Sequence, residues 1–194
     1  YAGGAGLLRR MDARLAAVLK RAKARGARTY VDVVSPYRQN WDFLRRALPW
    51  TDFFHCNADE AADLTGRSEP RRALEAVRAL GARHVFLTRG EAGLLAAVPG
   101  AVLEVPSFAV RVTDPTGAGD TFAGGVMGAL ARAGAVPPGC EDMAAAAVEA
   151  VPGARPVVPV IRRLRPDLQV KGTDYTPETT PEADAVRRHG GRVA

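Results

Sequence analysis

The sequence predicts an α/β fold in which a mainly parallel sheet lies between layers of helices, a three-layer α/β/α arrangement. Three observations support this prediction. Short apolar runs rich in β-branched and aromatic residues alternate with longer segments of helical periodicity. Capping residues and glycines stand where those helical segments should begin and end. The pair Pro99-Gly100 joins two apolar runs closely enough for a hairpin, so we expect an antiparallel edge on the sheet.

The N-terminal part of the chain predicts a helix, a strand and a second helix. From Met11 onward, apolar residues recur at i, i+3, i+4 and i+7 until Gly26, which is the spacing of an amphipathic helix. Residues 29–34 form a β-branched run suited to a buried strand. Residues 40–48 predict a short helix, which we expect Pro49 to stop.

The next segment continues the alternation. Residues 51–56 predict a second strand, and Asn57 can cap a helix that runs through Leu64 and ends at Gly66. A further helix over 70–80 precedes a third strand at 84–88. Strands and helices that alternate at this spacing predict right-handed crossovers between parallel strands.

The rhythm changes after this point. We expect hairpin strands at 93–98 and 101–105, then a strand at 110–112, a helix of small residues at 121–133 and another helix at 141–151. Residues 155–194 contain five prolines and many charges without a sustained period. They predict a short strand or two at most, or a loosely held tail.

The composition excludes several classes of protein. The 194 residues are 47% hydrophobic and 25% charged, which is typical of a globular domain. No apolar run approaches the roughly 18 residues that span a bilayer, and no secretory leader opens the chain, so we expect no membrane association. Cys56 and Cys140 are too few for a disulfide framework and lack the spacing of a zinc site. They indicate free thiols and a reducing, cytoplasmic location.

The formal net charge of +6 does not indicate a nucleic-acid binder. Residues 1–30 carry eight basic and one acidic residue, residues 31–154 eleven and fifteen, and residues 155–194 eight and five. The middle of the chain is therefore acidic, and the N-terminal excess is explained by one solvated helix face. Aromatic residues make up only 6% of the chain, so the basic stripe with interleaved aromatics that nucleic-acid binding needs is missing.

The strongest chemical signal lies where a predicted strand meets the helix of small residues. The segment Gly117-Ala118-Gly119-Asp120 would present helix N-terminal N–H groups and the positive end of the helix dipole, which together can bind a phosphate. The glycines allow positive φ and close approach to a phosphate. Asp120 would repel an anion, so its presence indicates a general base that takes a proton from an attacking hydroxyl. The alternative is that Asp120 only caps the helix and the glycines only form a turn.

Three motifs together resemble the ribokinase-like (PfkB) carbohydrate kinases over roughly residues 1–153. The segment from Asp114 through Asp120 to Gly125 resembles the C-terminal signature of that family nearly letter for letter. Upstream and in the same order, Asn57-Ala-Asp-Glu60 resembles the family's Asn-x-x-Glu motif, and Thr88-Arg-Gly90-Glu-Ala-Gly93 its Thr-x-Gly-x-x-Gly nucleotide loop. Three matches in register are more specific than any one of them.

This resemblance implies ATP- and Mg²⁺-dependent phosphorylation of the hydroxyl of a sugar or related small alcohol. Asp120 would be the catalytic base, and the N–H groups of Gly117, Ala118 and Gly119 would form an anion hole for the phosphoryl group. Glu60 and Asn57 would order Mg²⁺ and its waters; the less favoured alternative for Glu60 is an exposed helix carboxylate. The resemblance places the remaining nucleotide-binding residues at Asn57, Thr88, Gly90, Gly93, Asp114 and Thr116.

The resemblance is partial. The family's first strands, its Gly-Gly substrate motif and its β lid have no counterpart here, so we expect the ribokinase-like fold without N-terminal strands and lid. The sugar is therefore not named by the sequence, and a homodimer, which relatives often form through the lid, is an expectation for the full-length protein only. Residues 32–38 are a weaker candidate site. They lie at the end of a predicted strand, and ligands of α/β proteins bind near the carboxyl ends of strands. The isolated histidines, His55, His84 and His189, receive no role.

Residues 154–194 suggest a separate segment. Residues 164–175 and 186–193 are similar to a stretch of the nucleotidylyltransferase domain in bifunctional ADP-heptose synthesis proteins, but no His-x-Gly-His motif is present. We therefore expect a kinase core at 1–153 followed by a tail, which could be a remnant of a second domain. Two functional alternatives stay open beside the kinase: a non-catalytic nucleotide-binding fragment, and part of a bifunctional heptose-phosphate kinase and nucleotidylyltransferase.

Overall fold

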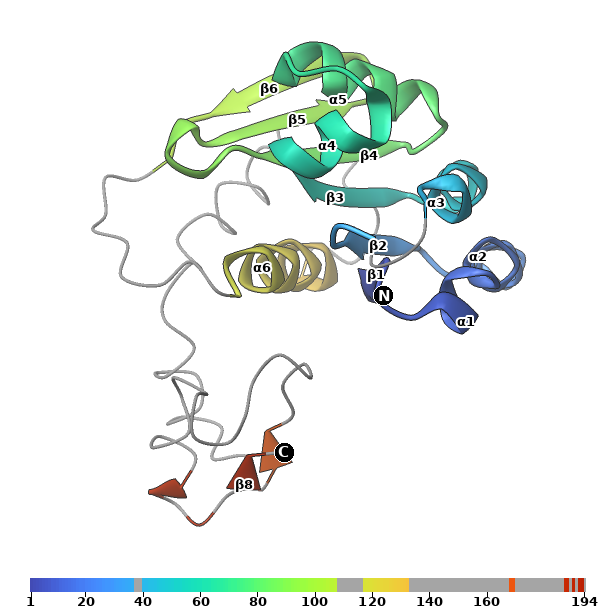
Figure 1. The fold of residues 1–194 in the computed structure, drawn as a ribbon, viewed down its shortest axis with the longest axis vertical. Coiled ribbons are helices and arrows are strands. Elements are labelled where there is room, and N and C mark those ends of the chain that lie inside the picture. The colour runs from blue at the N-terminus through green and yellow to red at the C-terminus, as the bar shows by residue number, and fades with distance from the viewer. Residues whose placement is uncertain are drawn as a thin grey trace.

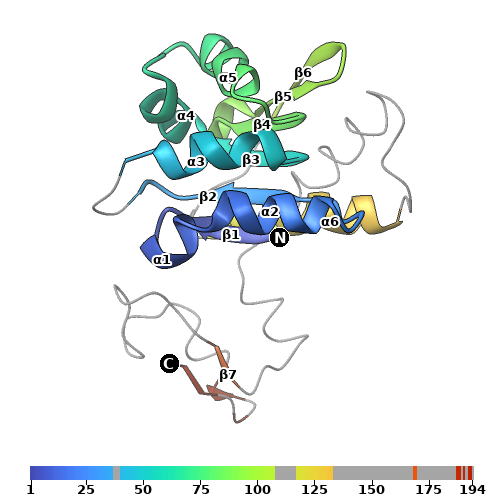
Figure 2. The same cartoon turned by 90° about the vertical axis from the view of Figure 1, so that its right-hand side faces the viewer.

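The described part of the chain is built around one six-stranded sheet, shown in Figures 1 and 2. The structure is a computed structural model that describes residues 1–36, 40–107, 117–132, 168–169, 187–188, 190 and 192–193. The strands lie in chain order: β1 (Ala2–Ala5), β2 (Tyr30–Val33), β3 (Phe53–Asn57), β4 (His84–Thr88), β5 (Leu94–Val98) and β6 (Ala101–Val105). Strands β1 to β4 pair in parallel, and β4, β5 and β6 pair antiparallel. The mainly parallel sheet with an antiparallel edge hairpin is therefore confirmed.

Helices cover both faces of this sheet, which confirms the three-layer prediction (Figures 1 and 2). One face packs against four helices, α2 (Leu15–Lys23), α3 (Asp42–Ala47), α4 (Ala58–Thr65) and α5 (Pro70–Ala79). The other face packs against α6 (Ala118–Arg132) through Phe122, Ala123, Val126 and Leu130. Each face of the sheet has its own hydrophobic core. Alternate residues of a strand belong to different cores, because successive side chains point to opposite faces.

The register of β2, β3 and β4 decides what lies under α6. Tyr30 pairs with Phe53 and Phe53 with His84, while Asp32 pairs with His55 and His55 with Phe86. These residues share the face that α6 covers. Toward the carboxyl ends of the strands this face therefore becomes polar, with Asp32, His55 and Thr88 replacing the aromatic rings.

Most predicted elements agree with the structure, with three corrections. The Gly-rich start of the chain forms strand β1, which the sequence did not predict, because AGGA has no β-branched residue and its strand depends on pairing with β2. Helix α3 ends at Ala47, close to the stop predicted at Pro49, but a 3-10 helix at Leu48–Trp50 follows it directly. Pro49 is tolerated there because the first residues of a helix need no N–H donor. The predicted helix near residue 11 is split into α1 (Arg9–Asp12) and α2.

Some predictions lie outside the described residues, among them the strand at 110–112 and the helix at 141–151. In the tail, β7 (Leu168–Gln169) and β8 (Arg192–Val193) pair in parallel. The division into a kinase core at 1–153 and a tail at 154–194 stays a prediction. No helix in the described part of the chain is both long and apolar enough to cross a membrane.

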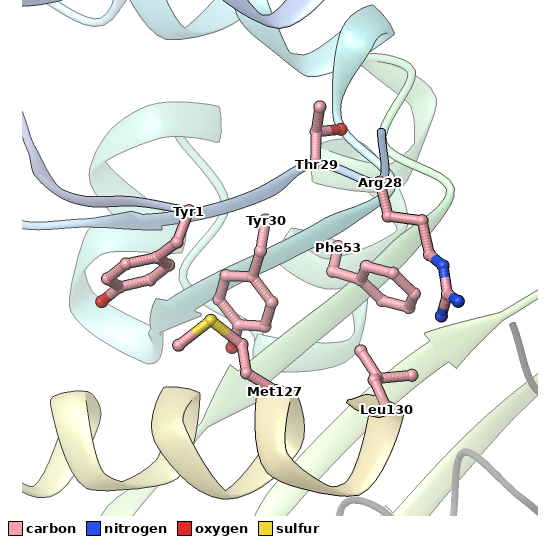
Figure 3. Close-up of a pocket in the computed structure, with 7 residues that line it drawn as sticks. All are labelled: Tyr1, Arg28, Thr29, Tyr30, Phe53, Met127 and Leu130. Carbon is pink, nitrogen blue, oxygen red and sulfur yellow. The ribbon is translucent and has the colours of Figure 1, made fainter. Parts of the chain in front are cut away.

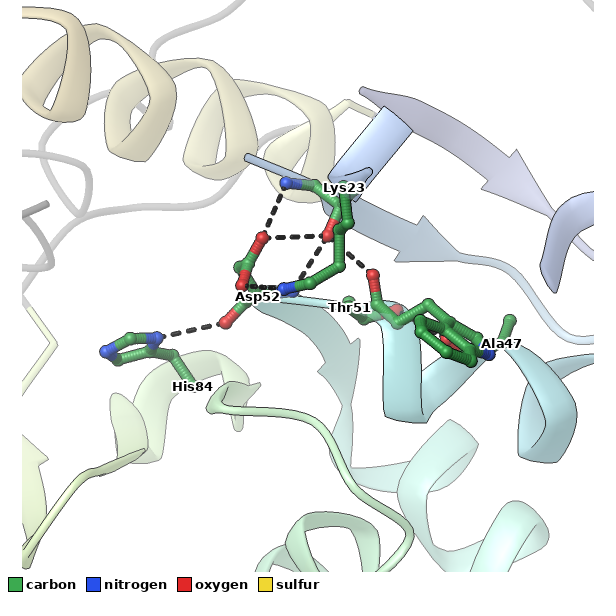
Figure 4. A network of polar contacts seen from close by, with 7 residues as sticks. Lys23, Ala47, Thr51, Asp52 and His84 are labelled. Atoms are coloured by element: carbon green, nitrogen blue, oxygen red, sulfur yellow. Dashed lines mark hydrogen bonds and ion pairs between the residues drawn. The ribbon is translucent and has the colours of Figure 1, made fainter. Parts of the chain in front are cut away.

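A polar cluster fastens the amino ends of the strands (Figure 4). The Asp52 carboxylate accepts hydrogen bonds from Lys23 Nζ at 2.5 Å and from the Thr29 N–H at 3.0 Å. The Asp52 carbonyl accepts from His84 Nδ1 at 2.9 Å. Burial raises the pKa of Asp52, but the hydrogen bonds from Lys23 and Thr29 outweigh that effect and hold the pKa below its ordinary value. The cluster ties α2 and the starts of β2, β3 and β4 together.

Candidate active site

The carboxyl ends of β2, β3 and β4 meet the beginning of α6, and most of the described site residues gather there. In open parallel sheets ligands bind at this edge. Asp32 Oδ1 lies 2.8 Å from His55 Nδ1, and His55 Nε2 lies 3.2 Å from Thr88 Oγ1. Asp32 and His55 are buried, with 6% and 3% of their surface exposed. One buried polar chain therefore links three adjacent strands.

The segment Gly117–Asp120 begins the helix that covers this edge. Gly117 has φ of 80°, and its carbonyl accepts hydrogen bonds from the Thr121 N–H at 2.9 Å and the Thr121 hydroxyl at 2.7 Å. Ala118, Gly119 and Asp120 form the first turn, whose N–H groups have no acceptor within the helix. Gly119 has helical backbone, so only Gly117 uses the positive φ that the sequence suggested for both glycines. Asp120 is exposed.

Asn57 and Glu60 act together at the start of α4. The Asn57 side chain accepts from the Glu60 N–H, and the Glu60 carboxylate accepts from the Asn57 N–H, both at 2.8 Å. This reciprocal pair is a capping box, which confirms the prediction that Asn57 caps this helix. Glu60 is buried rather than exposed, and burial raises its pKa above the ordinary value.

The same two side chains fit a magnesium ion that is bound through water. The capping bond engages one carboxylate oxygen of Glu60, and a carboxylate can accept about four hydrogen bonds or metal contacts. Among the described residues, no three His, Cys, Asp or Glu side chains are grouped closely enough to hold a metal by themselves. Mg²⁺ is commonly held by one or two carboxylates, waters and substrate phosphates, so such a cluster is not required.

Gly90 and Gly93 form the tight turn between β4 and β5. Gly90–Ala92 is a single 3-10 turn that begins two residues after Thr88. The Arg89 N–H donates to the Gly93 carbonyl at 2.8 Å, and the Gly93 N–H donates to the Gly90 carbonyl at 3.0 Å. Only Arg89 separates this turn from Thr88, so the turn lies at the carboxyl end of β4. Asp114 and Thr116 lie outside the described residues.

His55 is the functional candidate that reasoning from sequence missed. Its ring lies 4.9 Å from the ring of Phe122 on α6, and it bonds Asp32, which belongs to the weaker candidate segment 32–38. Alternation along residues 53–57 already placed His55 on the same face as Asn57. The pairing register of β2 with β3 was needed to bring it to Asp32.

A cavity of about 220 Å³ lies elsewhere on the α6 face (Figure 3). It opens between the amino ends of β2 and β3 and the second half of α6, and none of the predicted site residues lines it. The lining residues are Tyr1, Arg28, Thr29, Tyr30, Phe53, Met127 and Leu130. Site and cavity are therefore different places, and the chemistry points to the carboxyl edge.

Comparison with known proteins connects this geometry to a family. Cytidine kinase of Thermococcus kodakarensis is 32% identical over 117 residues, which cover 57% of this chain and 42% of that protein. Bifunctional protein HldE of Syntrophotalea carbinolica is 59% identical over only 34 residues, 18% of this chain and 7% of that protein. The chain thus matches less than half the length of these curated relatives.

The structural comparison agrees. Aminoimidazole riboside kinase from Salmonella enterica, solved with aminoimidazole riboside and an ATP analog, has a TM-score of 0.64 and 26% identity. The match covers 72% of this chain and 48% of that one. The model of the pfkB family of carbohydrate kinases matches residues 4–151. Since this match covers well over half of the 194 residues, the chain belongs to the pfkB family of carbohydrate kinases.

Proposed function

We propose that the chain forms part of the catalytic core of a kinase that transfers the γ-phosphoryl group of ATP to a hydroxyl of a sugar, nucleoside or related small alcohol. One observation carries the proposal. The first turn of α6, with Gly117, Ala118, Gly119 and Asp120, begins over His55 at the carboxyl edge of the sheet. His55 in turn contacts Thr88, the first residue of the predicted nucleotide loop.

In this proposal Asp120 is the general base. Its exposed carboxylate accepts the hydroxyl proton as the acceptor oxygen forms a bond to the γ-phosphorus. The bond between that phosphorus and the bridging oxygen breaks, and ADP leaves with its electron pair. The N–H groups of Gly117, Ala118 and Gly119, together with the dipole of α6, stabilise the charge on the transferring phosphoryl oxygens.

The remaining residues position the nucleotide. Bound Mg²⁺ would neutralise phosphate charge, and Asn57 and Glu60, which meet at the start of α4, would hold its waters. Thr88, Gly90 and Gly93 form the edge against which the nucleotide would lie. Asp114 and Thr116 precede the anion hole in the sequence, and we assign them to the nucleotide site by their motif.

The relatives support both substrates of the proposal. The ATP analog in the aminoimidazole riboside kinase supports ATP as the donor. Cytidine kinase, fructokinase and aminoimidazole riboside kinase, each at least 32% identical over 92 residues or more, support a sugar or a ribose-bearing acceptor. Acceptor screens should therefore begin with cytidine, fructose and aminoimidazole riboside.

The test is Asp120→Asn in the protein from the full reading frame, assayed for ADP release with each acceptor. We expect kcat to fall by about 10² to 10⁴, because a general base contributes roughly that factor. ATP binding, measured by calorimetry, should persist. Glu75→Gln is the matched control, since Glu75 is an exposed carboxylate on helix α5, which does not contribute to the site, and we expect it to keep wild-type kcat.

Two results would contradict the proposal. Undiminished turnover by Asp120→Asn would remove Asp120 as the base. ATP binding by the wild-type protein without turnover on the whole acceptor panel would favour the alternative of a non-catalytic nucleotide-binding fragment.

A second candidate is a bifunctional protein that joins a heptose-phosphate kinase to a nucleotidylyltransferase. The short match to Bifunctional protein HldE supports it, and so does the resemblance of residues 164–193. In this candidate, residues 1–153 are the kinase core and residues 154–194 belong to the second domain. The full-length protein should then phosphorylate a heptose phosphate in preference to cytidine or fructose, and its reading frame should encode a His-x-Gly-His motif.

A further inference from the structure

His55 is a buried side chain with a hydrogen-bond partner at each ring nitrogen, and the proposed reaction does not use it. Only 3% of its surface is exposed, and both ring nitrogens have partners, Asp32 Oδ1 at 2.8 Å and Thr88 Oγ1 at 3.2 Å. The second oxygen of Asp32 accepts from the Tyr1 hydroxyl at 3.3 Å. Contacts at both nitrogens fix the orientation of the imidazole ring, whichever nitrogen carries the proton.

The His55 ring packs against helix α6. The Phe122 ring lies 4.9 Å from it at an interplanar angle of 37°, and Phe122 also packs edge-on against Phe86 at 5.7 Å. A Cβ added at Gly119 would lie 3.4 Å from His55 Cε1, so the imidazole and the first turn are separated by the space of about one carbon atom. His55 therefore lies beside the helix turn and the end of β4 at once.

We propose that His55 is a positioning residue, which holds the first turn of α6 and the Thr88 hydroxyl in one fixed arrangement. This inference rests on the proposed function, because the turn carries Asp120 and the anion-hole N–H groups. Asp32 keeps the ring from rotating, Phe122 and Gly119 set the distance of the helix, and Thr88 receives the second bond. Displacement of a catalytic group by about 1 Å can lower a rate by roughly 10².

The test compares variants of His55 that keep either the ring contact with Phe122 or one of the two hydrogen bonds. His55→Phe keeps a ring against Phe122 and loses both hydrogen bonds. His55→Gln can reach Thr88 with its amide, whereas His55→Asn can reach only Asp32. We expect kcat per ATP-binding site to fall about 10- to 100-fold in His55→Phe, with KM for ATP within about threefold of wild type. Gln should retain more activity than Asn.

His84→Asn is the matched control. His84 is also a buried strand histidine on the α6 face, stacked on Phe53 at 4.8 Å, but it lies at the amino end of β4. A merely structural role of His55 would resemble this control, with lower stability and unchanged kcat per active site. Wild-type kcat in His55→Phe would overturn the inference while leaving the Asp120 result, and hence the proposed function, intact.

A second measurement does not depend on turnover. Hydrogen exchange of the peptide that contains Gly117–Phe122 should be faster in His55→Phe than in wild type and in His84→Asn, because the first turn of α6 loses its support. Equal exchange in His55→Phe and wild type would overturn the inference even if no acceptor is found. Faster exchange with an inactive wild type would support the inference and contradict the proposed function.

Discussion

Gly93 is the residue where a single added carbon should do most harm. Its φ is 81° and its ψ −139°, and a Cβ there would lie 2.2 Å from the Val105 carbonyl oxygen. That backbone conformation is essentially restricted to glycine. Gly93→Ala should lower the free energy of unfolding by about 3 kcal/mol, measured by urea denaturation.

Gly90→Ala is the control from the same loop. Gly90 also has positive φ, 57°, but a Cβ there would meet no atom within 4 Å. Its cost should be only about 1 kcal/mol, from backbone strain alone. Equal destabilisation by the two variants would show that the contact with Val105 contributes nothing.

At the scale of elements, helix α4 combines a structural cap with the proposed magnesium site. Asn57→Ala removes the side chain that accepts from the Glu60 N–H, so we expect a loss of about 1 kcal/mol in unfolding free energy. Asn57→Ser keeps a capping oxygen and should lose only a few tenths of a kcal/mol. If Asn57 also orders Mg²⁺, both variants should need more Mg²⁺ for half-maximal turnover, measured by titration of the full-length protein. A Ser variant with wild-type Mg²⁺ dependence would leave Asn57 as a cap alone.

At the scale of the whole molecule, the cluster around Asp52 and His84 makes stability depend on pH. Burial is the main cause that lowers the pKa of His84 below its ordinary 6.5, so the folded protein keeps the ring neutral while the unfolded chain takes up a proton. The stabilisation is therefore complete above about pH 6.5 and is lost as pH falls below that value. The thermal midpoint should drop between pH 7.5 and 5.5, and by less in His84→Asn, which does not titrate.

The shifted pKa values of Asp52 and Glu60 also affect how stability depends on pH, but they do not disturb the comparison of wild type with His84→Asn. Asp52, whose pKa lies below its ordinary 3.8, loses its stabilisation only in stronger acid. Glu60, whose pKa is raised above 4.5, opposes the trend, since protonation relieves its burial. Both are unchanged in His84→Asn, so the difference between the two proteins reports His84. Identical pH curves would contradict this assignment.

Sequence alone determined many of the local elements. Asn57 capping, the end of α4 at Gly66, the start of α5 at Pro70 and the hairpin around Pro99-Gly100 were predictable, because each depends on residues a few positions apart. Only the tertiary structure decided three things. Strand β1 exists because β2 supplies its hydrogen bonds, and Glu60 is buried because α4 packs on the sheet. His55 lies beside Asp32, Thr88 and Gly119, which are 23, 33 and 64 positions away in the sequence, because of the strand register and the packing of α6 on the sheet. No local sequence pattern encodes contacts over such separations.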